Sequence, residues 1–254
     1  MKDNNEANFY IDGQHYDFMM KSRNLHHNRV KFFLKQTKKF GGPVLELACG
    51  TGLITIPIAK EGMSVVGLDF SDLMLEHARN KSKEQNLEID WIKEDMMNFS
   101  LNKKFSSIIM PGLAMNWILD NKNIEKCLLC VKNHLNNEGR FIFDVFNPHL
   151  GVLLRDPSIK YPEYEYPNPN GEGIVEVSGT HNYDKKSQVS DVKTYYFIEN
   201  EEFVKKIKLR MLFPQELDAL LYYNGFSIDY KYGSYNEQPF TSDSSNQIVV
   251  CHKV

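Results

Sequence analysis

The segment VLELACGTG, residues 44–52, decides the fold. An apolar run ends at Glu46, and the chain then turns through Ala48, Gly50 and Gly52 into the amphipathic stretch LITIPIAKEG. Glycine turns sharply and leaves room for a ligand because it has no Cβ. Backbone amides at the start of the following helix would face whatever lies above the turn. The segment therefore predicts a strand, a ligand-binding turn and a helix.

Outward from this segment, short apolar runs alternate with amphipathic spacers of helix length as far as about residue 146. The apolar runs are residues 44–48, 64–69, 89–95, 105–111 and 140–146. The spacers are residues 53–62, 71–86 and 121–136. Strands that alternate with helices form a parallel sheet with helices on both faces. The sequence therefore predicts an α/β fold with a doubly wound, mostly parallel sheet.

The chain changes character after residue 150. Residues 150–174 are rich in proline and tyrosine, which favours an extended or looped path. Three strand-like runs then follow up to residue 212, separated by the polar turns DKKS and ENEE. In the third run, EFVKKIKLRML, residues alternate so that one face is mostly apolar and the other mostly basic. This pattern predicts an antiparallel meander.

The two ends of the chain complete the expected organisation. Residues 14–40 read as helical and stop at Gly41-Gly42-Pro43. A later helix begins at Pro214 and ends near Gly225, and two final strand-like runs close the sheet. The expected units are a helical cap (1–40), a ligand-binding core (41–149 and 213–254) and an antiparallel insertion (150–212).

Acidic side chains recur where the second and third strands end. Asp69 ends VVGLD, and Asp95 follows the third strand in KEDMMNF. An ionised carboxylate offers only acceptors, so Asp69 can bind both hydroxyls of a ribose. Asp95 with Met96 can read the edge of an amino-purine. Each acid alone is explained by strand-end solvation or helix capping, but successive strand ends of such a sheet line one crevice, which indicates a nucleotide-type ligand.

The motifs VLELACGTG, GLDFSDLMLEHAR and EDMMNF, in this order and spacing, resemble those of class I S-adenosylmethionine-dependent methyltransferases. The resemblance covers about residues 40–147 and continues more loosely to FPQELDALLYYNGF. It is similar to the small-molecule branch, such as sugar N,N-dimethyltransferases and glycine-type N-methyltransferases, which carry an antiparallel insertion after the fifth strand. It implies a Rossmann-like, seven-stranded core of methyltransferase type, S-adenosylmethionine as methyl donor and S-adenosylhomocysteine as product.

The resemblance also implies roles for single residues. The methionine moiety would be bordered by Tyr16, Glu46, Ala48, Gly50 and Gly52. The ribose would be held by Asp69, and the adenine would be flanked and read by Phe70, Met74, Asp95 and Met96. The reacting centre would be faced by Gly112. The segment PGLAMNW lacks the N/D-P-P-Y/F of base- and glutamine-methylating relatives, which argues against those substrates.

Catalysis by this chemistry depends mainly on position. The sulfonium methyl is already activated, and holding the reactants in line can account for about 7–11 kcal/mol of barrier lowering. An amine acceptor presents a lone pair, whereas a hydroxyl can require a base. The polar candidates near the expected mouth are Tyr16, His26, His27, Asn116, Asp144, Asn147 and His149. We expect Tyr16, Asn116 and His149 to take part, with Asn116 only orienting the acceptor because an amide is no base.

The expected acceptor is a small molecule covered by the insertion, whose Tyr161, Tyr164 and Tyr166 offer large contact areas. A protein or peptide acceptor and a non-catalytic S-adenosylmethionine-binding protein are the alternatives. A nicotinamide oxidoreductase is disfavoured because residue 55 is threonine where a dinucleotide fingerprint has its third glycine.

The composition indicates which partners and which location to expect. The formal net charge of −3 is unlike the basic surface that binds nucleic acid. No apolar run approaches the roughly 20 residues that cross a bilayer, and the start MKDNNEANFYIDGQ lacks the apolar core of a signal peptide. We therefore expect a cytoplasmic monomer or homodimer that binds neither nucleic acid nor membrane.

No metal site is expected. Cys127 and Cys130 form a C-x-x-C, but they lie in IEKCLLCVKNHL, where apolar residues recur at helical spacing. No second pair of ligands follows at a distance typical of zinc sites, and no H-x-x-x-H occurs. The two cysteines are therefore expected in the core of an amphipathic helix.

Overall fold

A computed structural model describes residues 13–22, 24–169, 171–198 and 200–254. The cap begins with two helices, α1 (Gly13–Lys21) and α2 (Asn24–Phe40), in place of the single helix expected over residues 14–40. Residues 1–12 of the expected cap lie outside the described residues. Helix α2 buries Phe32 and Phe33 against one face of the core sheet, together with α3 (Thr55–Lys60).

The core is a seven-stranded sheet in the order β10-β11-β5-β4-β1-β2-β3. Its parallel part consists of β1 (Val44–Leu47), β2 (Val65–Asp69), β3 (Asp90–Lys93), β4 (Phe105–Met110) and β5 (Leu135–Phe146). The strands β10 (Phe226–Tyr232) and β11 (Asn246–Lys253) complete it, and β11 runs antiparallel to both neighbours. This confirms the predicted doubly wound, mostly parallel fold, although β5 begins five residues before residue 140.

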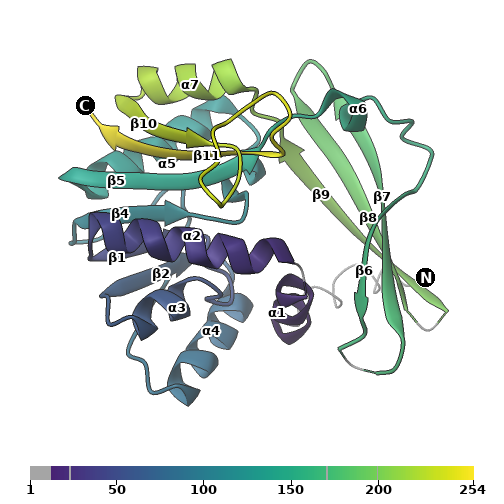
Figure 1. The fold of residues 1–254 in the computed structure, drawn as a ribbon, viewed down its shortest axis with the longest axis horizontal. Helices are drawn as coiled ribbons and strands as arrows, with labels where there is room; N and C mark the ends of the chain where they lie inside the picture. The colour runs from purple at the N-terminus through teal and green to yellow at the C-terminus, as the bar shows by residue number, and fades with distance from the viewer. Residues whose placement is uncertain (1–12, 23, 170, 199) are drawn as a thin grey trace.

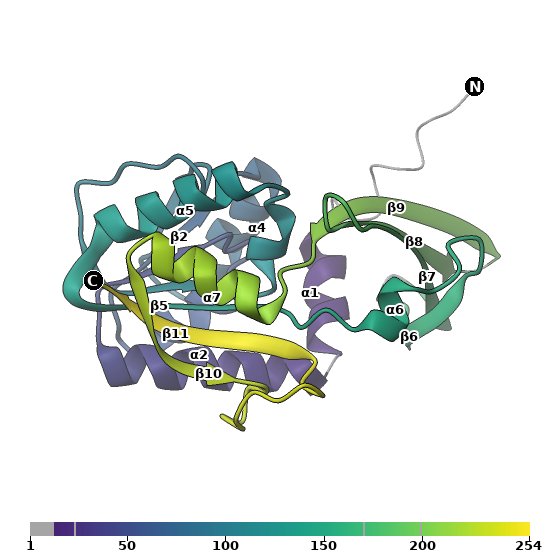
Figure 2. The same ribbon diagram turned by 90° about the horizontal axis from the view of Figure 1, so that it is seen from above.

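Helices cover both faces of this sheet (Figures 1 and 2). On the face opposite α2 and α3, the sheet packs against α5 (Asn121–His134) and α7 (Pro214–Tyr223) in one large apolar cluster. Cys127 is fully buried in that cluster, as its helical spacing predicted, and Cys130 packs at its edge. Helix α4 (Asp72–Glu84) lies along β2 and β3.

The insertion forms a separate antiparallel sheet in the order β6-β7-β8-β9. Its strands are β6 (Tyr161–Pro167), β7 (Ile174–Asp184), β8 (Val189–Ile198) and β9 (Glu201–Arg210), preceded by the short helix α6 (Leu150–Leu153). The three strands expected after residue 174 are present, and β6 adds a fourth within the segment expected to be extended or looped. Pro162 and Pro167 are tolerated there because β6 is an edge strand.

Helix α1 lies between the antiparallel sheet and the core (Figures 1 and 2). One apolar cluster joins Met19 of α1 to Tyr166, Val177 and Tyr196 of the antiparallel sheet. A second cluster joins the same sheet to α6 and to the segment that leads into α7. We call the face that carries these clusters the inner face. In the described part of the chain, no helix is both long and apolar enough to cross a membrane.

Candidate functional site

The turn after β1 has the backbone that its sequence predicts. Ala48, Gly50 and Gly52 all lie in the left-handed region, with φ of 54°, 53° and 77°. A Cβ at Gly50 would meet no atom within 4 Å, so this glycine borders open space. A Cβ at Gly52 would lie 2.5 Å from the ring of Trp91. Gly50 therefore leaves room for a ligand, whereas Gly52 also lets Trp91 pack beneath the turn.

Asp69, at the end of β2, braces this turn. Its two carboxylate oxygens accept hydrogen bonds from the backbone N–H of Gly50 at 2.8 Å and of Ser71 at 2.9 Å. Burial raises the pKa of Asp69 above its ordinary value, and the bonds from the two amides work in the opposite direction. Each oxygen of an ionised carboxylate keeps a further lone pair for a ribose hydroxyl. The side chain can therefore hold the turn and a ligand together.

The carboxyl ends of β1 and β3 lie on either side of Asp69, because β2 stands between these two strands. Phe70 is 77% exposed, which leaves its ring available to a flat ligand, while Met74 is partly buried on the first turn of α4. Asp95 is exposed and accepts a hydrogen bond from the backbone N–H of Met97 at 2.8 Å. Met96 packs against the large apolar cluster. These placements suit the adenine-binding roles that the resemblance implies.

Glu46 lies below the turn. It is buried on β1 and accepts a hydrogen bond from the hydroxyl of Thr55 on α3. Burial raises its pKa to about 8, and the bond from Thr55 only partly opposes that effect. A cationic group bound above the turn would favour the ionised form of Glu46.

Helix α1 closes over the turn. The carboxylate of Asp17 accepts hydrogen bonds from the hydroxyl of Thr51, within the turn, and from the ammonium of Lys81 on α4. Tyr16 is partly buried beside this contact, and burial raises the pKa of its hydroxyl above the ordinary value. The charges of Asp69 and Glu46 act on that hydroxyl in the same direction. Tyr16 therefore lies near both strand ends, where the resemblance implies an aromatic residue.

A second turn, after β4, forms the neighbouring part of the site. Gly112 and Leu113 both have left-handed backbones, with φ of 80° and 63°. The backbone N–H of Leu113 donates a 2.6 Å hydrogen bond to the carboxylate of Asp144, on β5. Asp144 also accepts a hydrogen bond from the hydroxyl of Tyr235, in the loop between β10 and β11. Gly112, predicted at the reacting centre, therefore lies in a turn that is fixed from behind.

Arg29 of α2 completes this buried network. Its Nε donates to the hydroxyl of Tyr235 at 2.9 Å and lies 3.6 Å from the carboxylate of Asp144. Burial works to lower the pKa of Arg29, but Asp144 and Tyr235 outweigh it and raise that pKa above its ordinary value. The guanidinium Nη1 lies 3.9 Å from the position of a Cβ on Gly112. The structure thus places a permanent cation beside the turn after β4.

The predicted catalytic residues Asn116 and His149 are placed differently from Tyr16. Asn116 lies in η1 (Ala114–Trp117) with no exposed surface, and its amide donates to the carbonyl of Arg210 at 2.7 Å. Its side-chain oxygen accepts from the backbone N–H of Phe146 at 3.1 Å. In this arrangement Asn116 holds η1 between β5 and β9 and has no group turned to an acceptor. His149 is exposed at the start of α6, on the side of the antiparallel sheet.

The three tyrosines of the insertion also lie in different surroundings. Tyr166 is 2% exposed, and its hydroxyl forms a 2.6 Å hydrogen bond with Nε2 of His15. Tyr164 packs in the same cluster, and its hydroxyl lies 3.6 Å from the sulfur of Met19. Tyr161 instead lies below the guanidinium of Arg155, at 4.6 Å from the ring centre. Two of the three therefore join the antiparallel sheet to α1.

Sequence reasoning missed Asp17 and Arg29. Arg29 had one usable signal, because it stands four residues before Phe33, which places a cation on the buried face of an amphipathic helix. Asp17 had none, since its partners Thr51 and Lys81 lie far along the chain.

No group of three histidine, cysteine, aspartate or glutamate side chains that could hold a metal forms within the described ranges. The expectation that catalysis needs no metal stays a prediction.

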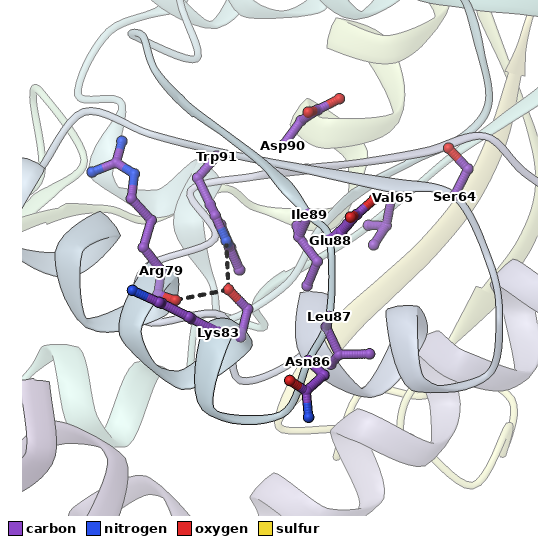
Figure 3. Close-up of a pocket in the computed structure, with 11 residues that line it drawn as sticks. Ser64, Val65, Arg79, Lys83, Asn86, Leu87, Glu88, Ile89, Asp90 and Trp91 are labelled. Atoms are coloured by element: carbon purple, nitrogen blue, oxygen red, sulfur yellow. Dashed lines mark hydrogen bonds between the residues drawn. The ribbon is translucent and has the colours of Figure 1, made fainter.

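A cavity of about 780 Å³ lies away from these turns (Figure 3). It is formed where β2 and β3 begin and where α4 ends, with Trp91 donating to the hydroxyl of Ser82 at 3.1 Å. The predicted binding residues follow the carboxyl ends of the strands, whereas this cavity lies at the amino ends of β2 and β3. It contains none of them.

Residues 44–139 match the family model described as "Methyltransferase domain". A curated methyltransferase from Geobacillus sp. is 26% identical over 122 residues, and that alignment covers 46% of this chain and 49% of the relative, so the chain matches about half of the relative's length. A solved S-adenosylmethionine-dependent methyltransferase from Clostridium acetobutylicum has a TM-score of 0.77 at 20% identity and covers 94% of this chain and 96% of its own. The amino pentose methyltransferase CalS10 from Micromonospora echinaspora, solved with S-adenosylmethionine bound, has a TM-score of 0.70 at 16% identity, with coverage of 95% and 96%.

Proposed function

We propose that the chain is a class I S-adenosylmethionine-dependent methyltransferase, with its methyltransferase domain over residues 44–139, and that it methylates a nitrogen or oxygen atom of a small-molecule acceptor. The fold is as the sequence predicted, and the family match over residues 44–139 and the solved neighbours support the predicted family and cofactor. The acceptor class, the atom methylated and the residues that act are the subject of the proposal.

One observation carries the proposal: the turn after β1 is covered by elements from outside the parallel sheet. Helix α1 is bonded to the first turn through Asp17 and Thr51, and the antiparallel sheet packs on α1 from the other side. Such a cover suits a small acceptor better than a folded macromolecule. The net charge of −3 also disfavours nucleic acid as acceptor.

The residues at the first turn fit the cofactor. Gly50 borders open space, Asp69 keeps acceptor capacity beside it, and the ring of Phe70 is exposed next to both. Arg29 offers a cation near Gly112, which suits the carboxylate of the methionine moiety. When bound, S-adenosylmethionine supplies a methyl group already activated on a sulfonium.

The chain's own contribution is then mainly orientation. Burial keeps the hydroxyl of Tyr16 protonated at neutral pH, so that it acts as a hydrogen-bond donor and not as a base. Asp144 directs one carboxylate oxygen to Leu113 and the other to Tyr235, so its role is to fix the turn after β4. With both groups committed in this way, an acceptor that brings its own lone pair is favoured, which supports an amine over a hydroxyl.

The proposal is tested by incubating the purified chain with methyl-labelled S-adenosylmethionine and a metabolite extract fractionated by size. Labelled products are then identified by mass spectrometry. We expect label and a gain of one methylene mass in the small-molecule fraction. Label confined to protein or peptide would overturn the small-molecule acceptor.

Binding of S-adenosylhomocysteine, measured by calorimetry, serves as the control for the cofactor site. Tight binding without any labelled product in either fraction would instead support a non-catalytic cofactor-binding protein. NAD in the same titration should give no heat of binding.

A further inference from the structure

Tyr235 stands between two buried charges, the guanidinium of Arg29 and the carboxylate of Asp144. The Nε of Arg29 donates to the hydroxyl of Tyr235 at 2.9 Å, whereas it lies 3.6 Å from Asp144, beyond hydrogen-bond distance. The hydroxyl has a single proton, which it donates to Asp144. Burial, with the charge of Asp144, raises the pKa of Tyr235 above its ordinary value, so the hydroxyl keeps this proton. Its lone pairs therefore face Arg29, and the direction of both hydrogen bonds is fixed.

This arrangement keeps Asp144 from pairing directly with Arg29. A carboxylate pairs most strongly with arginine through two parallel hydrogen bonds. Here one oxygen of Asp144 accepts from the backbone N–H of Leu113 at 2.6 Å and the other accepts from Tyr235. Because a guanidinium is a planar, rigid fork, a partner fixed on Nε also fixes where Nη1 and Nη2 point. Tyr235 therefore sets the orientation of the whole group.

The tip of the guanidinium is directed to the turn after β4. Its Nη1 lies 3.9 Å from the position of a Cβ on Gly112. In the parts of the chain that the structure describes, the one hydrogen bond that this guanidinium donates comes from Nε. Arg29 is only 6% exposed, and buried N–H groups without an acceptor are costly. Nη1 and Nη2 are therefore suited to an acceptor group that a ligand brings.

The order of the strands indicates which part of the cofactor would reach this tip. The residues expected to bind adenine and ribose follow β3 and β2, and the sheet continues through β1 to β4. A cofactor with its ribose at Asp69 and its adenine over β3 extends across the turn after β1 toward Gly112. The end of S-adenosylmethionine opposite the adenine is an amino acid, whose carboxylate offers acceptors only. That carboxylate is the group that matches the tip of Arg29.

We propose that Tyr235 is a positioning residue for the cofactor, which turns Arg29 so that Nη1 and Nη2 bind the methionine carboxylate. The loop that carries Tyr235, between β10 and β11, lies beside α2 and far outside residues 44–139 (Figures 1 and 2). The inference rests on the proposed function and deepens it, because it assigns part of cofactor recognition to this loop. Without the hydroxyl, Arg29 pairs directly with Asp144 and its tip turns away from the cofactor.

The test compares two probes by calorimetry on the full chain. One is S-adenosylhomocysteine, and the other is decarboxylated S-adenosylhomocysteine, which keeps the amine and lacks the carboxylate. Wild type should bind the first at least about tenfold more tightly, the scale of a hydrogen bond to a charged group. Tyr235→Phe should reduce this ratio at least about threefold, because one misdirected hydrogen bond is lost only in part. The affinity for the decarboxylated probe should stay within about twofold, since that probe does not use the tip of Arg29.

Tyr232→Phe is the matched control. Tyr232 and Tyr235 both pack on the ring of Phe32, with 5.9 and 6.0 Å between ring centres, and both variants lose one phenolic hydroxyl. Tyr232 lies on β10, outside the network of Arg29. Its variant should therefore keep the wild-type ratio of the two affinities.

Urea denaturation separates positioning from a purely structural role. Because Arg29 can pair directly with Asp144 in Tyr235→Phe, the free energy of unfolding should fall less in this variant than in Asp144→Ala. Equal losses of affinity for both probes in Tyr235→Phe would show that Tyr235 only stabilises the site, and this result would overturn the inference. An unchanged ratio in Tyr235→Phe would overturn it as well.

Arg29→Lys provides a second variant if Tyr235→Phe does not fold. It keeps the charge but lacks the planar fork, so it should also lower the ratio, and an unchanged ratio would overturn the inference. A wild type that binds both probes equally well would overturn this inference alone. A wild type that does not bind S-adenosylhomocysteine would instead refute the proposed cofactor site.

Discussion

The carboxylate of Asp144 on β5 accepts a 2.6 Å hydrogen bond from the backbone N–H of Leu113, the residue that follows the conformationally demanding Gly112. A residue other than glycine in the left-handed region costs roughly 1–2 kcal/mol. The bond to Asp144 offsets that cost and fixes the turn after β4. Because Asp144 is also joined to Tyr235 and Arg29, three distant elements share one buried network.

Asp144→Ala should therefore destabilise the fold strongly. The substitution leaves Arg29 buried without its carboxylate and releases the amide of Leu113, so we expect a loss of about 3–5 kcal/mol in the free energy of unfolding. Urea denaturation measures it. Asp243→Ala, an exposed acid, is the control and should change that free energy by no more than about 0.5 kcal/mol. Equal free energies of unfolding in the two variants would show that the buried network contributes little to stability.

Gly50→Ala and Gly52→Ala should separate ligand binding from packing. Both positions have positive φ, so each variant should lose roughly 1–2 kcal/mol of stability from backbone strain. Gly52→Ala should lose more, because its Cβ collides with Trp91, whereas a Cβ at Gly50 meets only open space. Gly50→Ala should instead lose more affinity for S-adenosylhomocysteine than Gly52→Ala does, when the loss is compared with each variant's loss in the free energy of unfolding. Calorimetry measures the affinity and urea denaturation the free energy of unfolding on the same samples. Equal losses of both quantities in the two variants would contradict the distinction.

Asp69→Ala should weaken binding of S-adenosylmethionine by about 1.5–3 kcal/mol, the scale of hydrogen bonds to a charged group. Part of this loss comes from the turn, because the amide of Gly50 loses its acceptor. Asp69→Asn keeps one acceptor oxygen and should lose less. Asp95→Ala should have a milder effect, since water can replace a bond at an exposed adenine edge. Affinity that is unchanged in Asp69→Ala would remove the ribose assignment.

Glu46 should make the stability of the ligand-free chain depend on pH. Burial raises its pKa from 4.5 to about 8, so within that window the folded state holds a proton that the unfolded state releases. Its contribution is complete below the lower value and is lost as pH rises, with a slope of up to about 1.4 kcal/mol per pH unit. In Glu46→Gln this slope should vanish from urea denaturation midpoints measured across the window. A wild type whose stability rises through the same window, relative to Glu46→Gln, would reverse the assigned direction.

The insertion tyrosines should respond unequally to substitution. Tyr166 lies in the cluster between the antiparallel sheet and α1, so Tyr166→Ala should cost about 3–5 kcal/mol, as for other large core aromatics. Tyr161 is half-buried, lies outside that cluster and contacts the guanidinium of Arg155, so Tyr161→Ala should cost less than Tyr166→Ala, about 1 kcal/mol. Thermal unfolding compares them. If Tyr161 contacts the acceptor as the sequence suggested, Tyr161→Ala should raise the acceptor KM without changing S-adenosylhomocysteine affinity.

The sequence by itself determined the order of the core strands and of α3, α4, α5 and α7, because hydrophobic periodicity is a local property, but it did not determine β6 or α6. It also determined the turn after β1, since the glycines of VLELACGTG take positive φ wherever that turn forms. Asp69 and Asp95 were found because strand ends can be read from the same periodicity. The predicted family and cofactor rest on those local motifs.

Only the tertiary structure decided which residues meet at the turn after β4. Arg29 and Tyr235 are separated by 206 positions, and Tyr235 and Asp144 by 91. Their contact depends on how α2, β5 and the loop after β10 pack, and no local pattern carries that information. The same reason explains Asn116, whose position in the sequence suggested an acceptor contact. Packing of η1 between β5 and β9 turned both ends of its amide toward backbone groups, because buried polar groups must be bonded.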